Sequence, residues 1–174
     1  THVDSSAASD VYKRQYMEDE VSFFSNLLTS LDARNNIAPK TENYLLEVDE
    51  PLVIPVNKRV RFLITANDVI HSWWVPDFAV KQDAIPGFIN TAWTYVDEPG
   101  VYRGQCTELC GVYHGYMPIV VKAVSDSEYK DFIQGKRDLK AQQALLTEKL
   151  WETDELFAIC LLYTSDAADE STCV

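Results

Sequence analysis

The chain has 174 residues and is acidic, with 15 basic against 27 acidic side chains and a formal net charge of −12. This length suits one domain with a core of its own. The negative charge argues against nucleic acid and against an anionic membrane surface, and it suits a basic protein partner. No run approaches the roughly 20 apolar residues of a membrane span, and we do not expect the first residues to act as a signal peptide.

The two ends of the chain look foreign to it. SSAASDVYKRQ at 5–15 and CLLYTSDAADE at 160–170 resemble translations of an adapter used in DNA library preparation, the second from its reverse complement. We therefore expect residues 1–15 and 160–174 to be non-native, and we leave them out of the expected fold. These ends hold two basic and five acidic residues, so the remaining core keeps 13 basic against 22 acidic residues and a charge of −9.

Short runs with the pattern of β-strands follow one another through the core. The alternation of polar and apolar residues in RVRFLITA is typical of a half-buried strand. Turn signals such as DEP and DEPG separate the runs. Strands 8 to 12 residues apart with turns between them predict an all-β sandwich or barrel. We expect the tail of a strand at 16–28, a surface loop at 29–42, and strands at 43–48, 52–56, 59–66, 69–75, 89–96, 101–106 and 118–124.

A capping box marks the start of a helix after the last expected strand. Ser125 can accept a hydrogen bond from the backbone three residues on, and the Glu128 carboxylate can reach back. Good helix formers follow, with Gly135 as the expected interruption. We therefore expect a β domain over 16–125 and a C-terminal helical segment over 126–159.

The stretch CTELCGVYHGYM gathers Cys106, Cys110, His114 and Met117. Thiolate, imidazole and thioether form a soft ligand set that suits copper. One blue-copper ion needs one thiolate, two imidazoles and a weak axial methionine, so the second cysteine is surplus. Two copper ions bridged by both thiolates, with one imidazole for each ion, explain it. His71 is the candidate for the second imidazole because it is the other histidine of the core.

Two other interpretations of the cysteines stay open. Cys106 and Cys110 could form a disulfide in an exported protein, and two cysteines with two histidines could hold zinc. Met117 and the close spacing of the ligands favour copper.

His71 followed by C-x-E-x-C-x3-H-x2-M resembles the binuclear copper (CuA) domain of cytochrome c oxidase subunit II, in its bacterial form. The resemblance extends from about Tyr16 to about Ile133. It implies an all-β, cupredoxin-like Greek-key barrel or sandwich with a C-terminal helix. The flanking runs that agree are DVIHSWWVP at 68–76, KQDAIPGFIN at 81–90, GVYRGQCTELCG at 100–111 and HGYMPIVV at 114–121.

The resemblance implies a role for each residue of the site. Met117 would be the weak axial ligand on the copper of His71, and the backbone carbonyl of Glu108 the weak ligand of the other copper. The carboxylate of Glu108 would reach a magnesium ion shared with subunit I, in a hard, oxygen-ligated site. The implied copper ligands are His71, Cys106, Glu108, Cys110, His114 and Met117.

The resemblance also implies a docking surface for cytochrome c. Asp68 would belong to its acidic patch, with Trp73 and Asp77 as further candidates for contact or electron entry. Solvated surface charge and core packing are the alternatives for these three. Trp73 and Trp74 are adjacent, so on a strand they face opposite ways. We expect one to be buried beside the copper and the other to lie nearer the surface.

The expected function is electron transfer, from cytochrome c through two copper ions to haem in oxidase subunit I, where oxygen is reduced. The family implies two membrane helices ahead of the copper domain and a place at the periplasmic face of the bacterial inner membrane. The chain is therefore expected to be a fragment. The rivals are the copper domain of a nitrous oxide reductase, a structural subunit that has lost copper, and a copper-delivery protein. The first has an aromatic residue where Glu108 stands and lacks KQDAIPG.

Overall fold

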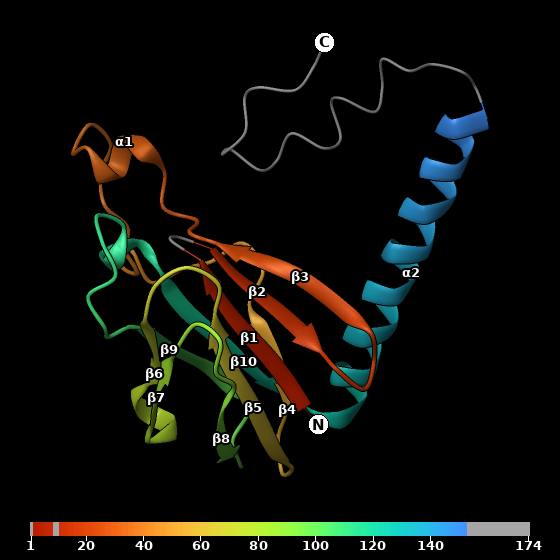
Figure 1. Cartoon of the computed structure of the whole chain (residues 1–174), viewed down its shortest axis with the longest axis horizontal. Helices are drawn as coiled ribbons and strands as arrows, with labels where there is room; N and C mark the ends of the chain where they lie inside the picture. Colours follow the sequence, from red (N-terminus) through yellow and green to blue (C-terminus); the bar gives the residue numbers. More distant parts are fainter. Residues whose placement is uncertain (1, 9–10, 153–174) are drawn as a thin grey trace. The chain divides into compact units, whose positions relative to one another are not determined.

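The computed structural model describes residues 2–8 and 11–152, and within them ten strands form two five-stranded sheets (Figure 1). This confirms the expected all-β class with a C-terminal helix. The strands are β1 (His2–Ala8), β2 (Val11–Tyr16), β3 (Val21–Asn26), β4 (Leu52–Pro55), β5 (Arg59–Ala66), β6 (His71–Val75), β7 (Val80–Ala84), β8 (Asn90–Tyr95), β9 (Gly100–Cys106) and β10 (Pro118–Val124). The helices are α1 (Leu31–Arg34), η1 (Pro76–Phe78), η2 (His114–Tyr116) and α2 (Asp126–Glu152).

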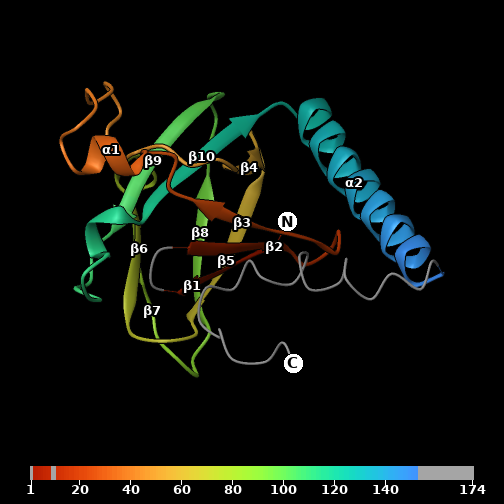
Figure 2. The same cartoon turned by 90° about the horizontal axis from the view of Figure 1, so that it is seen from above.

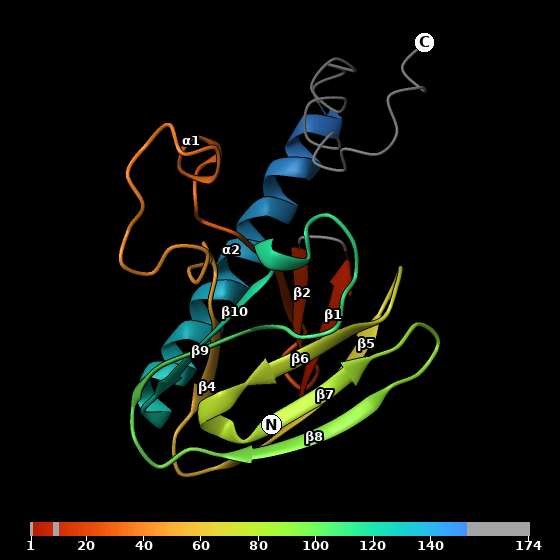
Figure 3. The same ribbon diagram turned by 90° about the vertical axis from the view of Figure 1, so that its left-hand side faces the viewer.

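The first sheet has the order β3-β2-β1-β5-β8 and the second has the order β4-β10-β9-β6-β7. Two pairs are parallel, β1 with β5 and β4 with β10, and the other named pairs are antiparallel. Strands distant in the sequence are thus neighbours in both sheets. β7 of the second sheet also lies beside β8 of the first (Figure 3).

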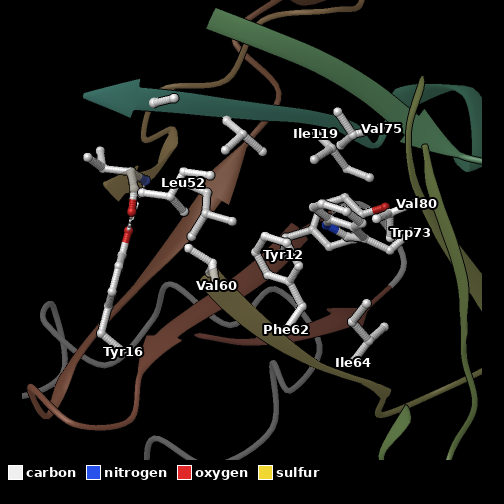
Figure 4. Close-up of a cluster of buried hydrophobic side chains, with 14 of the residues drawn as sticks. Tyr12, Tyr16, Leu52, Val60, Phe62, Ile64, Trp73, Val75, Val80 and Ile119 are labelled. Carbon is white, nitrogen blue, oxygen red and sulfur yellow. Dashed lines mark hydrogen bonds between the residues drawn. The ribbon is translucent and has the colours of Figure 1, made fainter. Parts of the chain in front are cut away.

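The core lies between the inner faces of the two sheets (Figure 4). In β5 every second side chain is buried, as the alternation in the sequence predicts. Phe62 on β5 packs against Trp73 on β6 with 4.8 Å between the ring centroids. The aromatic contact therefore joins the first sheet to the strand that begins with His71.

Tyr16 adds a polar link between the sheets. Its fully buried hydroxyl donates to the carbonyl oxygen of Val53 and accepts from the Val53 N–H, both at 2.8 Å. Both hydrogen bonds join the end of β2 to β4, and Figure 4 shows the tyrosine reaching that strand.

The segment between β3 and β4 differs from the expectation. Residues 43–45 form a turn, and 46–48 form no strand beyond one bridge between Val48 and Leu27. Leu45 has a φ of 60°, and its N–H donates to the Thr29 hydroxyl at 3.1 Å. The N–H of Leu45 is therefore bonded within the loop, and only the end of the segment pairs with the chain after β3, where the Glu47 carbonyl accepts from the Leu28 N–H at 3.0 Å.

The loop predicted at 29–42 contains the short helix α1. Its N-cap is Ser30, whose hydroxyl accepts from the Ala33 N–H at 3.3 Å. The guanidinium of Arg34 lies 5.3 Å from the ring of Tyr116 in η2. The helix therefore stands beside the segment that carries the expected ligands (Figure 2).

Residues 2–8 and 11–16, which include most of the expected non-native leader, form β1 and β2 in the structure. Tyr12 and Arg14 are buried there. The origin of these residues in the coding DNA stays a prediction. The expected tail at 160–174 lies outside the described residues.

α2 begins at the predicted capping box. The Glu128 N–H donates to the Ser125 hydroxyl at 3.3 Å, and the Ser125 N–H donates to the Glu128 carboxylate at 3.0 Å. Gly135 does not interrupt the helix. One compact unit extends to Ile133, which is buried in the core, and a second begins at Gln134. Among the described residues no helix has the length and apolar character needed to cross a membrane.

Candidate metal centre

Two adjacent strands and the loop between β9 and β10 position the site. His71 is the first residue of β6 and Cys106 the last of β9, and these strands pair with Trp73 opposite Cys106. The backbone bond from the Thr107 N–H to the Ser72 carbonyl, 3.1 Å long, continues the pairing into the loop. The sheet thus brings together a histidine and a cysteine that are 35 residues apart.

The loop returns to the same place through backbone hydrogen bonds. The Cys106 N–H donates to the Met117 carbonyl oxygen at 3.3 Å, so both ends of the loop are held together. Between them, His114 opens η2 and its N–H donates to Gly111 at 3.2 Å. Gly111 has a φ of 124°, which favours glycine at this turn.

The two sulfurs form the middle of the site. Cys106 Sγ and Cys110 Sγ are 3.8 Å apart, whereas a disulfide bond is about 2.05 Å long. Both cysteines are unbridged. Since metal–thiolate bonds are about 2.3 Å long, two sulfurs at this separation can both bind one ion.

Each sulfur has its own imidazole. His71 Nδ1 lies 3.8 Å from Cys106 Sγ, and His114 Nδ1 lies 3.4 Å from Cys110 Sγ. Both rings therefore present the same nitrogen to the sulfur pair. The ligand atoms of His71, Cys106 and Cys110 all lie within 4.8 Å of one another.

The two expected weak ligands also face the sulfurs. Met117 Sδ is 3.5 Å from Cys110 Sγ, and the carbonyl oxygen of Glu108 is 3.4 Å from Cys106 Sγ. The side chain of Met117 is fully buried, while Glu108 is exposed. The structure therefore brings all six predicted ligand residues together.

Cys106 belongs to the buried core, and the partly buried Cys110 packs against that core. Burial raises the pKa of the Cys110 thiol to about 12, and the neighbouring Cys106 contributes to the rise. A bound metal cation would replace the thiol protons, because a metal binds the thiolate. The soft donor set, the sulfur separation and the two Nδ1 atoms together fit copper.

Asp68 has a contact that the sequence analysis did not anticipate. Its Oδ1 lies 2.8 Å from His71 Nε2, with 34% of the Asp68 side chain exposed and 1% of that of His71. Asp68 precedes β6, so the turn before the strand folds its carboxylate back over the ring. Asp68 is therefore more than the surface charge expected from the sequence, because its carboxylate is also bonded to His71, a candidate metal ligand.

The other candidates for partner contact lie at different depths. Trp73 is buried, and Trp74 is half-buried with the Lys81 ammonium 4.7 Å from its ring centroid. This confirms the expected division of the two rings. Asp77 is exposed in η1. Among these, Trp74 and Asp77 are accessible to a partner, and Trp73 reaches one only through its neighbours.

The family model of the cytochrome c oxidase subunit II periplasmic domain matches residues 7–124. The chain belongs to this family. It is 48% identical over 118 residues to the probable cytochrome c oxidase subunit 2 of Rickettsia conorii, covering 68% of this chain and 36% of that protein. The identity to cytochrome c oxidase subunit 2 of Cereibacter sphaeroides is 40% over 136 residues, covering 71% and 45%. The chain thus spans less than half the length of these subunit II relatives.

Solved structures of subunit II domains share the fold. The periplasmic domain of subunit II (CoxB) of Bradyrhizobium japonicum superposes with a TM-score of 0.70 at 33% identity, covering 79% of this chain and 93% of that one. A second structure, with a TM-score of 0.64 at 33% identity, covers 79% and 90%. It is a mixed-disulfide intermediate between thioredoxin-like TlpA and the subunit II domain.

Proposed function

We propose that this domain carries electrons through a pair of copper ions as part of a cytochrome c oxidase. The observation that carries the proposal is the paired arrangement of the site, in which each of two unbridged sulfurs 3.8 Å apart faces the Nδ1 of a separate histidine. One mononuclear site needs only one thiolate. Two bridging thiolates with one imidazole at each end suit two ions.

The ligands divide between the two ends of the site. Cys106 and Cys110 would bridge, His71 and His114 would each hold one ion, and Met117 and the Glu108 carbonyl would be the weak ligands. A bound copper pair supplies reversible one-electron exchange. The chain supplies two thiolates whose charges reduce the cost of burying cations, together with a scaffold of paired strands that limits rearrangement when the charge changes.

The proposed partners follow from charge and family. The acidic chain suits a basic cytochrome c, with Asp68 and Asp77 on the docking side and Trp74 or Trp73 near the electron path. Electrons would pass to haem in subunit I, and the exposed Glu108 carboxylate would hold a magnesium ion shared with that subunit. Membrane helices ahead of this segment would place it at the periplasmic face of the bacterial inner membrane.

The relatives also suggest how the thiols are kept reduced. A subunit II domain 33% identical to this one forms a mixed disulfide with a thioredoxin-like protein. In the described chain Cys106 is buried and Cys110 is half-buried. If Cys106 and Cys110 became oxidised to a disulfide, the dithiol of a thioredoxin-like protein would therefore reach the Cys110 sulfur first. Its reduction of the disulfide would leave two thiols able to bind copper.

Copper reconstitution tests the proposal. We expect two coppers per chain by metal analysis and a seven-line electron paramagnetic resonance pattern, since one unpaired electron is shared by two copper nuclei. Cys110→Ser should abolish the pattern and leave at most one ion. Cys160→Ser, which changes a cysteine outside the ligand set, should retain it. Uptake of a single ion by the unchanged chain would refute the proposal.

A further inference from the structure

The hydrogen bond between Asp68 and His71 connects the interior of the site with its surface. The His71 ring is buried, with Nδ1 facing Cys106 Sγ at 3.8 Å and Nε2 facing Asp68 Oδ1 at 2.8 Å. Both ring nitrogens are thus engaged. We propose that Asp68 is a positioning residue that fixes the His71 ring and transmits the charge of a docked cationic partner to the metal centre.

The positioning follows from the donor and acceptor rules of imidazole. A neutral ring has one N–H donor and one nitrogen acceptor. A carboxylate accepts only, so Asp68 keeps the proton on Nε2 and leaves the lone pair of Nδ1 directed at the sulfurs. Such carboxylate–histidine pairs fix the tautomer and ring orientation and make the ring a stronger donor to a metal.

Asp68 can transmit the charge of a docked partner to the metal centre because it is itself charged and partly exposed. An anion bonded to a ligand stabilises the more positive, oxidised state of the site and so lowers its reduction potential. Its field also reaches the sulfur pair, because Asp68 Oδ1 lies 2.8 Å from Nε2 of the His71 ring and Nδ1 of the same ring lies 3.8 Å from Cys106 Sγ. Since 34% of the Asp68 side chain is exposed, a cationic group of a partner can approach it.

A cation beside Asp68 would offset the negative charge and raise the reduction potential while the partner is bound. The site would then accept an electron more readily from a docked donor than when alone. This step rests on the proposed electron-transfer function, whereas the positioning of the ring can be tested without metal.

The metal-free test is nitrogen NMR of the histidine rings. In the unchanged chain we expect the Nε2–H tautomer at His71, and in Asp68→Ala a mixture of the two tautomers. Asp131→Asn is the matched control because Asp131 is an exposed carboxylate on α2, and it should leave the His71 signals unchanged. An Nδ1–H tautomer in the unchanged chain would overturn the positioning role.

The copper-loaded test separates charge from hydrogen bonding. Asp68→Asn keeps an acceptor oxygen but loses the charge, so its reduction potential should rise relative to that of the unchanged chain and of Asp131→Asn. Asp68→Ala loses both and should also bind copper about 10- to 100-fold more weakly. A tenfold change in the relative affinity for the oxidised and reduced states corresponds to about 59 mV for one electron.

Tetralysine at low ionic strength serves as the probe of the surface. It should raise the potential of the unchanged chain and of Asp131→Asn, and have a much smaller effect on Asp68→Asn. Equal shifts in all three chains would overturn the transmission. Failure of the unchanged chain to take up two coppers would refute the proposed function instead, and the tautomer measurement would still decide the positioning role.

Discussion

Gly104 on β9 lies against the backbone of Trp74 on β6 so closely that a methyl group on Gly104 would be 1.9 Å from the Trp74 carbonyl oxygen. That atom belongs to the backbone, which cannot rotate aside as the end of a flexible side chain can. The same two strands carry Cys106 and His71. The distance between Cys106 and His71 therefore depends on residue 104 having no side chain.

Gly104→Ala should push β9 away from β6 and weaken both the fold and the metal site. We expect a loss of about 1–3 kcal/mol in the free energy of unfolding, as for other overpacked positions, and less than two coppers bound per chain. Gly100→Ala is the control on the same strand, since its new methyl would meet Tyr102 at an ordinary 3.6 Å. Chemical denaturation and metal analysis measure the two effects; equal behaviour of the two variants would contradict the argument.

Tyr16→Phe removes both hydrogen bonds that the tyrosine hydroxyl makes with Val53. The carbonyl and N–H of Val53 would then lose buried partners, and each such group costs about 1–3 kcal/mol. We expect the unfolding free energy to fall by about 2–4 kcal/mol in a denaturation experiment. Tyr129→Phe is the comparison, because its hydroxyl meets the Asp19 carboxylate at a longer 3.4 Å, and it should cost less than about 1 kcal/mol.

The sequence predicts best where one physical signal dominates. β5 follows from its alternation, and β10 matches the predicted 118–124 residue for residue. Cys106, Cys110, His114 and Met117 follow from their spacing, since a short loop has little freedom to separate them. His71 follows as the other histidine of the core, and the role of Glu108 follows from the family resemblance. β7 was missed because KQD is polar and only its flanking Val80 and Ala84 are buried.

Other features depend on contacts that spacing does not reveal. Residues 43–48 have the composition of a strand, but the Thr29 hydroxyl and the positive φ of Leu45 fix turns there. Asp68 is three residues before His71, a separation that pairs residues in helices and not in strands. Only the turn before β6 brings the two together. Gly104 is itself a signal of this contact, since glycine within a strand often marks a close approach of backbones.

Arg14 offers a stabilising change. Its side chain is fully buried in β2, and burial lowers its pKa to about 10 from an ordinary 12.5. A base with a lowered folded pKa costs stability at every pH below that value, and the cost fades only as the pH rises from about 10 toward 12.5. Arg14→Met keeps an unbranched chain without charge. Replacing a buried charged network by apolar groups is often favourable by about 1–4 kcal/mol.

We therefore expect Arg14→Met to raise the thermal midpoint at pH 7. Lys13→Met is the control, since the neighbouring Lys13 is exposed on the same strand and should change stability by less than about 0.5 kcal/mol. A lower midpoint for Arg14→Met would show that the interactions of the guanidinium, including its stacking 4.4 Å from the centroid of the Tyr12 ring, outweigh the cost of burial.

Copper uptake should release protons, because burial and Cys106 hold the pKa of Cys110 at about 12 in the metal-free chain. The thiol is then protonated at neutral pH, and the metal must displace its proton. Each proton released makes the apparent affinity rise about tenfold per pH unit, so binding should strengthen from pH 6 to pH 8. A pH indicator in weak buffer counts the protons as copper is added. Release of less than one proton per chain at pH 7 would contradict the raised pKa, and a copper affinity that is flat with pH would do so independently.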